Sequence, residues 1–307
     1  MKRDLITMLD IKDELKELID LAITMKAEMK DSLQFTPFKG RTLGLIFEKP
    51  SLRTRVSFEV GFSQLGGSSL YLSPSEIQVG KRESVHDVAK VLSRFVDIIM
   101  YRAFKNEMMV ELARHAEVPV INGLDNREHP CQAVADLMTM TEVKGSLKGR
   151  TLAWVGDGNN VLNSLMLGAP VLGMNVRAAC PKGYEPDPEV VRQARELGKK
   201  HKAVVQVMTD PREAVKGADV VYTDTWVSMG DEAEMERRLR DFAPYQVNMG
   251  LFILAKPDAI FMHCLPAHRG QEVTDEVMDC PRSVVFQEAE NRMHAQKAIM
   301  VRLMGKK

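Results

Sequence analysis

Short apolar runs alternate with amphipathic helical stretches along this chain of 307 residues, and this alternation constrains the fold more than any other feature. Strands that alternate with helices are typical of a parallel sheet with helices on both faces. In the first part of the chain we expect helices at 11–29, 53–65, 84–95, 107–116 and 132–142, and strands at 42–47, 69–72, 97–101 and 119–122.

A second alternation follows residues 143–150, where two glycines and three basic residues form a candidate hinge. There we expect strands at 151–155, 175–179, 204–207, 220–223, 259–262 and 283–286, and helices at 160–172, 187–201, 231–242 and 289–304. The predicted fold class is α/β, with two doubly wound parallel-sheet domains of similar size joined by linking helices. The domains would be residues 1–143, with the C-terminal helix 289–307 packed back on them, and residues 151–288.

The composition excludes several classes of protein. Lys and Arg number 42, as do Asp and Glu, so the chain lacks the positive field of a nucleic-acid-binding protein. No apolar run reaches the ~18 residues of a membrane helix, and the start does not resemble a signal peptide. The four cysteines are far apart and include no C-x-x-C pair, which favours buried thiols over disulfides or zinc ligands. We expect a cytoplasmic protein.

The densest group of chemically active residues runs from Phe47 to Arg55, where an expected strand ends and an expected helix begins. Backbone N–H groups, two hydroxyls and the guanidiniums of Arg53 and Arg55 are expected to converge there on a phosphate or another oxyanion. The alternative is a Ser N-cap with solvated arginines. However, cations in a first turn oppose the helix dipole unless an anion is bound, so the pattern favours an anion site.

Other polar residues follow expected strands of the first part. Arg102 ends one strand, and His129 and Gln132 lie at the start of a helix, where their donors could point at a small carbonyl compound. A salt bridge for the arginine and a structural role for the histidine are the alternatives.

The second part opens with Gly156-Asp157-Gly158-Asn159-Asn160-Val161. The third glycine of a dinucleotide-binding fingerprint would fall at position 161, which is valine, so we reject nicotinamide binding. The Asn pair at this helix start is instead expected to recognise a polar substrate, with ordinary N-capping as the alternative.

Two later loops also follow strands. Asp224 and Ser228 could hold the amine and the carboxylate of an amino acid, or could cap the next helix. His263 and Cys264 are adjacent, and adjacent side chains at a strand end point in opposite directions, so we expect Cys264 to bind or orient rather than to act as a nucleophile. Arg292 is another cation at a helix start.

Taken in order, these motifs resemble the aspartate/ornithine carbamoyltransferase family over essentially the whole chain, and most closely its ornithine-specific branch. The motifs are Ser51-x-Arg53-Thr54-Arg55, His129-Pro130-x-Gln132, Asp224-x-x-x-Ser228-Met229-Gly230 and His263-Cys264-Leu265-Pro266. The resemblance implies transfer of the carbamoyl group of carbamoyl phosphate to the δ-amine of L-ornithine, giving L-citrulline and phosphate, in arginine biosynthesis. It also implies a homotrimer or an assembly of trimers, and no metal or redox cofactor.

The resemblance further implies roles for individual residues. The catalytic residues would be Arg102, His129 and Cys264. L-Ornithine would be bound by Asn160, Asp224, Ser228 and Met229. Carbamoyl phosphate would be bound by Ser51, Leu52, Arg53, Thr54, Gln78, Arg102, His129, Gln132, Cys264, Leu265 and Arg292, with Gln78 on a loop that reaches the active site of a neighbouring subunit.

The chemistry of the residues agrees with this assignment. Attack of an amine on carbamoyl phosphate builds negative charge on the carbonyl oxygen, and Arg102, His129 and Thr54 are donors that could stabilise it. Asp224 and Cys264 could bias the amine toward its reactive, deprotonated form.

Two departures from the family pattern stand out: Leu52 occupies a position where Thr is also familiar, and the stretch 124–128 is unusually charged. Several alternatives remain open. The acceptor could be aspartate, putrescine, N-acetylornithine or N-succinylornithine, although a carboxylate at position 224 favours a free α-amino group. The chain could also be a non-catalytic binding relative that kept the fold.

Overall fold

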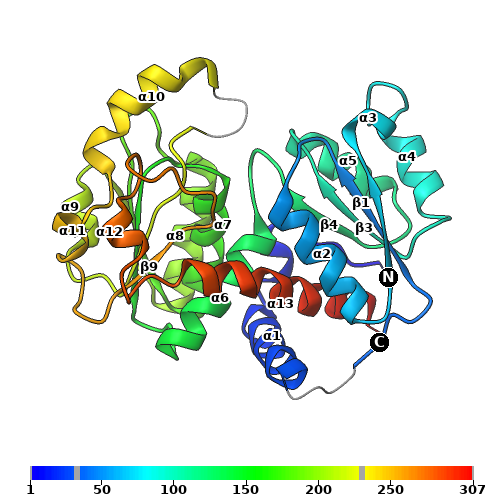
Figure 1. The fold of residues 1–307 in the computed structure, drawn as a ribbon, viewed down its shortest axis with the longest axis horizontal. Coiled ribbons are helices and arrows are strands. Elements are labelled where there is room, and N and C mark those ends of the chain that lie inside the picture. The colour runs from blue at the N-terminus through cyan, green and yellow to red at the C-terminus, as the bar shows by residue number, and fades with distance from the viewer. Residues whose placement is uncertain (1, 31–34, 228–231, 306–307) are drawn as a thin grey trace. The chain divides into compact units, whose positions relative to one another are not determined.

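Two parallel sheets carry the fold, one in each of two units (Figure 1). The computed structural model describes residues 2–30, 35–227 and 232–305. The first unit comprises residues 1–138 and 290–307, and the second comprises residues 139–289. The predicted α/β class with two parallel-sheet domains is confirmed.

The sheet of the first unit has the strand order β2-β1-β3-β4, and every neighbouring pair is parallel. Its strands are β1 (Thr42–Phe47), β2 (Ser68–Leu72), β3 (Ile98–Arg102) and β4 (Val120–Leu124). The helices before the unit boundary are η1 (Met8–Ile11), α1 (Leu15–Lys30), α2 (Leu52–Gln64), α3 (Pro74–Ile77), α4 (Val85–Leu92), α5 (Asn106–His115) and the first part of α6 (Pro130–Lys144). All of β3 is buried, because helices cover both faces of a central parallel strand.

The sheet of the second unit has the order β7-β6-β5-β8-β9 and is also parallel. Its strands are β5 (Thr151–Val155), β6 (Asn175–Ala179), β7 (Val205–Met208), β8 (Val220–Tyr222) and β9 (Ile260–Met262). Its helices are α7 (Asn160–Gly168), η2 (Ala169–Leu172), α8 (Pro188–His201), α9 (Pro211–Val215), η3 (Glu232–Glu234), α10 (Met235–Phe242), η4 (Ala243–Tyr245), α11 (Met249–Phe252) and α12 (Asp275–Met278).

Helices α6 and α13 (Val285–Met304) each contribute residues to both units, because the unit boundaries fall at 138/139 and 289/290. The candidate hinge at 143–150 lies inside the second unit. Of the helices in the described residues, none is long and apolar enough to cross a membrane.

The expected strand at 283–286 is wrong. Ser283 makes only an isolated bridge with Phe261, and α13 begins at Val285. A short apolar run fits either a buried strand or one turn of a helix. Val285 and Glu288 are buried whereas Phe286 is exposed, which is the spacing of a helix face.

Candidate active site

Helix α2 follows β1 after a short loop, residues 48–51, and residues 51–55 of the motif lie at its N-terminus. The Ser51 side chain is the N-cap, and its Oγ accepts a hydrogen bond from the Thr54 backbone N–H at 3.3 Å. Leu52 is 75% exposed, so it can contribute its backbone N–H, rather than its side chain, to an anion site at the helix start. The N-cap alternative therefore holds for Ser51, and it is compatible with anion binding by the N–H groups of the same turn.

The expectation that both arginines of the motif converge on one spot is wrong for Arg55. Its Nε donates to Glu59 Oε1 at 3.0 Å, and its guanidinium carbon lies 3.7 Å from the centre of the Tyr71 ring. Residues two apart on a helix face about 200° apart, so one face cannot present both side chains. Arg53 Nε, by contrast, is buried and has no hydrogen-bond partner among the described residues.

Thr54 is the centre of a buried cationic cluster in the first unit. Its Oγ1 accepts hydrogen bonds from Arg292 Nη2 at 2.6 Å and from Arg102 Nη1 at 3.3 Å. All three side chains are buried. Two guanidiniums on one hydroxyl bring positive charge and several N–H donors together at a buried point, which suits the binding of a phosphate or another oxyanion.

His129 lies beside these cations and is 4% exposed. Burial lowers the pKa of His129 well below its ordinary value of 6.5, and the charges of Arg292, Arg102 and Lys49 lower it further. The imidazole is therefore neutral near pH 7 and can donate a hydrogen bond without adding charge. Lys49 lies within the 47–55 motif, but the sequence analysis gave it no role of its own; its position between a strand end and Ser51 was the available signal.

Gln132 and Gln78 are the other first-unit residues of the predicted site, and their surroundings differ. Gln132 is buried, and its Nε2 donates to Asp136 Oδ1 at 2.8 Å, one turn along α6. Gln78 is exposed and has a φ of 42° in a turn that the Gly80 N–H closes onto the Glu83 carbonyl. The structure therefore brings Arg102, Arg292 and Thr54 together but leaves Gln78 at the surface of its own unit.

The charged stretch 124–128 is an internal scaffold for His129. Asp125 is fully buried, and its Oδ1 accepts the backbone N–H groups of Arg127 and Glu128 at 2.7 and 2.8 Å. Glu128 Oε2 accepts the Met8 N–H at 2.9 Å. These carboxylates accept hydrogen bonds from backbone N–H groups that would otherwise be buried without an acceptor.

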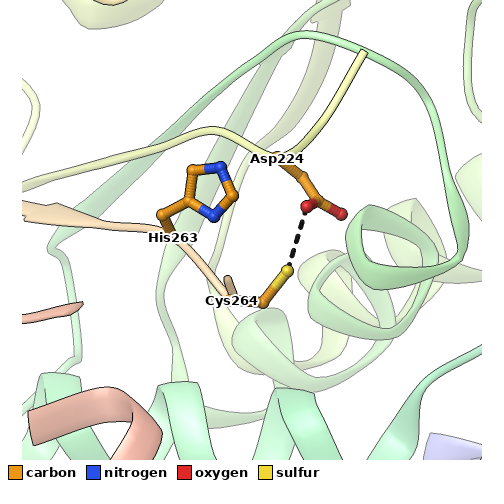
Figure 2. A group of neighbouring side chains, drawn as sticks. All are labelled: Asp224, His263 and Cys264. Carbon is orange, nitrogen blue, oxygen red and sulfur yellow. Dashed lines mark hydrogen bonds between the residues drawn. The ribbon is translucent and has the colours of Figure 1, made fainter. Parts of the chain in front are cut away.

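Asp224, at the end of β8, is the centre of the polar group in the second unit. Its Oδ1 accepts from the Cys264 thiol at 3.0 Å and from the Thr225 N–H at 2.8 Å. Its Oδ2 accepts from Asn159 Nδ2 at 2.7 Å. Figure 2 shows the Cys264 side chain directed at this carboxylate rather than paired with the ring of His263, so the hydrogen bonds favour an orienting role for the thiol.

Asn159, the first residue of the Asn pair expected from the sequence to recognise substrate or to cap the helix, has two roles in this group. Its Oδ1 caps α7 by accepting the N–H groups of Val161 and Leu162. Its amide holds Asp224. Asn160 is the first residue of α7 and is half-buried. Ser228 and Met229, predicted to bind L-ornithine, lie outside the described residues.

Asp224, His263 and Cys264 offer an oxygen, a nitrogen and a sulfur within 4.8 Å of one another, a set that could hold a metal ion (Figure 2). The imidazole is already engaged, however. His263 Nδ1 accepts the Leu265 N–H at 2.9 Å, and Nε2 lies 3.2 Å from Glu272 Oε1. Metal binding would break one of these hydrogen bonds, so the local chemistry favours a polar, metal-free site.

The cysteines divide into two groups. Cys131 and Cys180 are buried, as expected for all four, whereas Cys264 and Cys280 are half-buried. Burial raises the pKa of the Cys131 thiol to about 12, which makes this residue inert at neutral pH.

Comparison with known proteins agrees with both halves of this description. Residues 3–142 match the family model "Aspartate/ornithine carbamoyltransferase, carbamoyl-P binding domain". Residues 148–303 match "Aspartate/ornithine carbamoyltransferase, Asp/Orn binding domain". The two models together span nearly the whole chain.

Individual relatives are similar along their full length. The ornithine carbamoyltransferase of Methanobrevibacter smithii is 54% identical over 297 residues, which cover 97% of this chain and 98% of that protein. That of Picrophilus torridus is also 54% identical, covering 99% and 100%. The solved structure of ornithine carbamoyltransferase from Pyrococcus furiosus has a TM-score of 0.97 and 49% identity, covering 100% of this chain and 98% of that one. The chain therefore belongs to the aspartate/ornithine carbamoyltransferase family of transferases.

Proposed function

We propose that this protein transfers the carbamoyl group of carbamoyl phosphate to the δ-amine of L-ornithine, giving L-citrulline and phosphate. The observation that carries the proposal is the pair of guanidiniums, from Arg102 and Arg292, on the Thr54 hydroxyl. Guanidiniums are suited to bind phosphate oxygens, and the family model that matches this unit is that of a carbamoyl phosphate-binding domain.

In the first unit, Arg53 and the N-terminus of α2 bind the phosphate oxygens. Arg102 and His129 donate to the carbonyl oxygen, where negative charge develops as the amine attacks. A neutral His129 suits this role, because it donates a hydrogen bond without giving up a proton at once. The C–O bond to the phosphate then breaks, phosphate leaves with the electron pair, and the departing phosphate accepts the proton that the attacking nitrogen loses.

In the second unit, Asp224 binds the α-amino group of the acceptor, with Asn160, Ser228 and Met229 as further binding residues. Asp224 accepts hydrogen bonds from Cys264, Thr225 and Asn159, and a carboxylate offers about four acceptor positions, so the α-amino group can join these donors or replace the Cys264 thiol. Relatives named ornithine carbamoyltransferase at 54% identity support L-ornithine as the acceptor.

Three finer assignments belong to the same proposal: synthesis of L-citrulline for arginine, a cytoplasmic location and a homotrimer or an assembly of trimers. A solved relative from Campylobacter jejuni, described as an anabolic ornithine carbamoyltransferase, is 38% identical over 99% of this chain. Its name supports the synthetic direction.

The test is a steady-state assay with carbamoyl phosphate and, in parallel, L-ornithine, aspartate, putrescine, N-acetylornithine and N-succinylornithine. We expect L-citrulline from L-ornithine and no product from the other acceptors. Turnover of another amine would overturn the assignment of Asp224, and no turnover with any acceptor would indicate a non-catalytic binding protein.

A further inference from the structure

The ring of His263 connects two groups at the end of β9, and both of its nitrogens are used. Nδ1 accepts the backbone N–H of Leu265 at 2.9 Å, and Nε2 lies 3.2 Å from Glu272 Oε1. Because Nδ1 is an acceptor, Nε2 carries the hydrogen and donates it to the carboxylate. Both side chains are fully buried, so the geometry selects one tautomer and one ring orientation.

Glu272 closes the loop that His263 begins. Its Oε1 accepts from the ring of His263 and also from the backbone N–H of His268. One buried carboxylate oxygen therefore holds both ends of the segment 263–268, which contains Cys264 and Leu265.

A second buried carboxylate fixes the backbone at the start of this loop. Glu288 Oε2 accepts the His263 N–H at 3.0 Å, and Glu288 Oε1 accepts the Tyr222 hydroxyl at 2.9 Å. The backbone of His263 is thus held independently of its ring. Loss of the ring contacts would free the loop after His263 without detaching the strand end.

The backbone that the ring holds is in an uncommon conformation. Leu265 has a φ of 57°, in the left-handed region that a residue with a side chain rarely adopts. Such a conformation persists only where surrounding contacts over-determine it. The hydrogen bond from the Leu265 N–H to the ring is such a contact, and it fixes the peptide that joins Cys264 to Leu265.

We propose that His263, oriented by Glu272, is a positioning residue that sets the Cys264–Leu265 peptide in its reactive geometry. It touches neither substrate and acts through Leu265 and Cys264. The inference rests on the proposed function for the catalytic part of its test, because only that function makes these two residues part of the reacting centre.

Two amide substitutions of His263 distinguish a positioning role from a purely structural role. In His263→Asn, the side-chain oxygen falls near the place of Nδ1 and can accept the N–H two residues on, as in an Asx-turn. In His263→Gln, the amide reaches the place of Nε2, so it keeps the hydrogen bond to Glu272 and loses that to Leu265. A purely structural role would favour the Gln variant, which fills more of the space and keeps a partner for the buried carboxylate.

Positioning predicts the opposite order for catalysis. We expect His263→Gln to lose about 10²-fold in kcat, the effect of misplacing a reacting group by ~1 Å. His263→Asn should keep most of the kcat. If it is unstable, combining it with Glu272→Gln removes the buried charge left without its ring partner. Val277→Ala, at a fully buried apolar position on α12, is the control for lost stability alone and should keep the wild-type kcat.

A second readout does not depend on the reaction. The rate at which iodoacetamide alkylates Cys264, followed by mass spectrometry of the peptide, should rise in His263→Gln and stay near the wild-type rate in His263→Asn. Equal kcat values and equal alkylation rates in the two variants would overturn the positioning role. If the wild-type protein forms no L-citrulline, the proposed function fails, and the alkylation rates alone then decide for or against His263.

Discussion

Arg53 is the second residue of α2, close to the loop that joins this helix to β1. Its Nε is buried without a hydrogen-bond partner in the described part of the chain, whereas Arg55, two residues on, is held by Glu59 and Tyr71. The two arginines look equivalent in the sequence, and the helix gives them different surroundings. This difference supplies a matched pair of variants.

Arg53→Ala should lower kcat/KM for carbamoyl phosphate by about 10²-fold or more, because it removes a charge-assisted donor to the phosphate. Arg55→Ala should lose much less, since its guanidinium is engaged by Glu59 and Tyr71. Steady-state kinetics of both variants check the prediction. An equal or larger loss in Arg55→Ala would place the phosphate elsewhere.

His129 predicts a pH dependence of stability. Its pKa is depressed in the folded protein, so below pH 6.5 the unfolded chain takes up a proton that the folded chain does not. Falling pH therefore destabilises the fold by up to about 1.4 kcal/mol per pH unit until the folded pKa is reached, and no such contribution remains above pH 6.5. Denaturant unfolding between pH 5 and 8 should show a smaller acid loss for His129→Gln than for the wild type. Parallel pH profiles would contradict a neutral, buried imidazole.

Among the elements, α7 shows how one cap serves both folding and the site. Asn159 accepts two backbone N–H groups of the helix and donates to Asp224. The sequence signal, an Asn pair after a strand, predicted the helix start but not which Asn would cap it. That choice depends on the exact first residue of the helix, which a pattern locates only to within a few positions.

Asn159→Ala should cost about 1 kcal/mol for the lost cap, and more for the hydrogen bond that Asp224 loses. Asn248→Ala removes a comparable Asn cap from α11, where the Asn248 side chain accepts the Leu251 N–H. The control should therefore lose only the cap contribution, and its activity should be unchanged. Denaturant unfolding and the carbamoyl transfer assay measure both effects. Equal losses of activity in the two variants would show that the hydrogen bond between Asn159 and Asp224 does not contribute to activity.

The sequence analysis did not predict helices that are too short for their apolar residues to show a helical period. Helices α3, α9, α11 and α12 have four or five residues each and were not predicted. The expected helix 160–172 divides into α7 and η2 because Pro170 cannot continue the α-helical hydrogen bonding. The expected helix 231–242 is described only from residue 232, as η3 and α10.

For the whole molecule, an apolar surface on the first unit supports the proposed trimer. Leu52, Val56 and Val60 recur every four residues along α2 with exposed side chains, and Leu70 is exposed on the outer strand β2. Exposed apolar stripes of this kind mark interaction sites. A second copy of the chain is the partner that the proposed trimer supplies.

Light scattering coupled to size-exclusion chromatography should give the mass of a trimer, or of a multiple of trimers, for a chain of 34.5 kDa. Val56→Asp combined with Val60→Asp should lower that mass, because charges would be buried in the interface. Val204→Asp, at an exposed apolar position of the second unit, is the control and should not change it. A monomeric wild-type protein, or no change in the double variant, would contradict this surface as the interface.

The sequence by itself determined the α/β class, the positions of most strands along the chain and the motifs from which the family is recognised, because periodicity and turn residues are local properties. Only the tertiary structure decided which of those residues meet. Thr54 receives Arg292 from 238 positions away, Asp224 receives Cys264 from 40 positions away, and Arg55 leaves the group to which its motif assigned it. Contacts between distant segments depend on how whole elements pack and on where each helix begins, and neither is encoded in the local pattern that marks the residues.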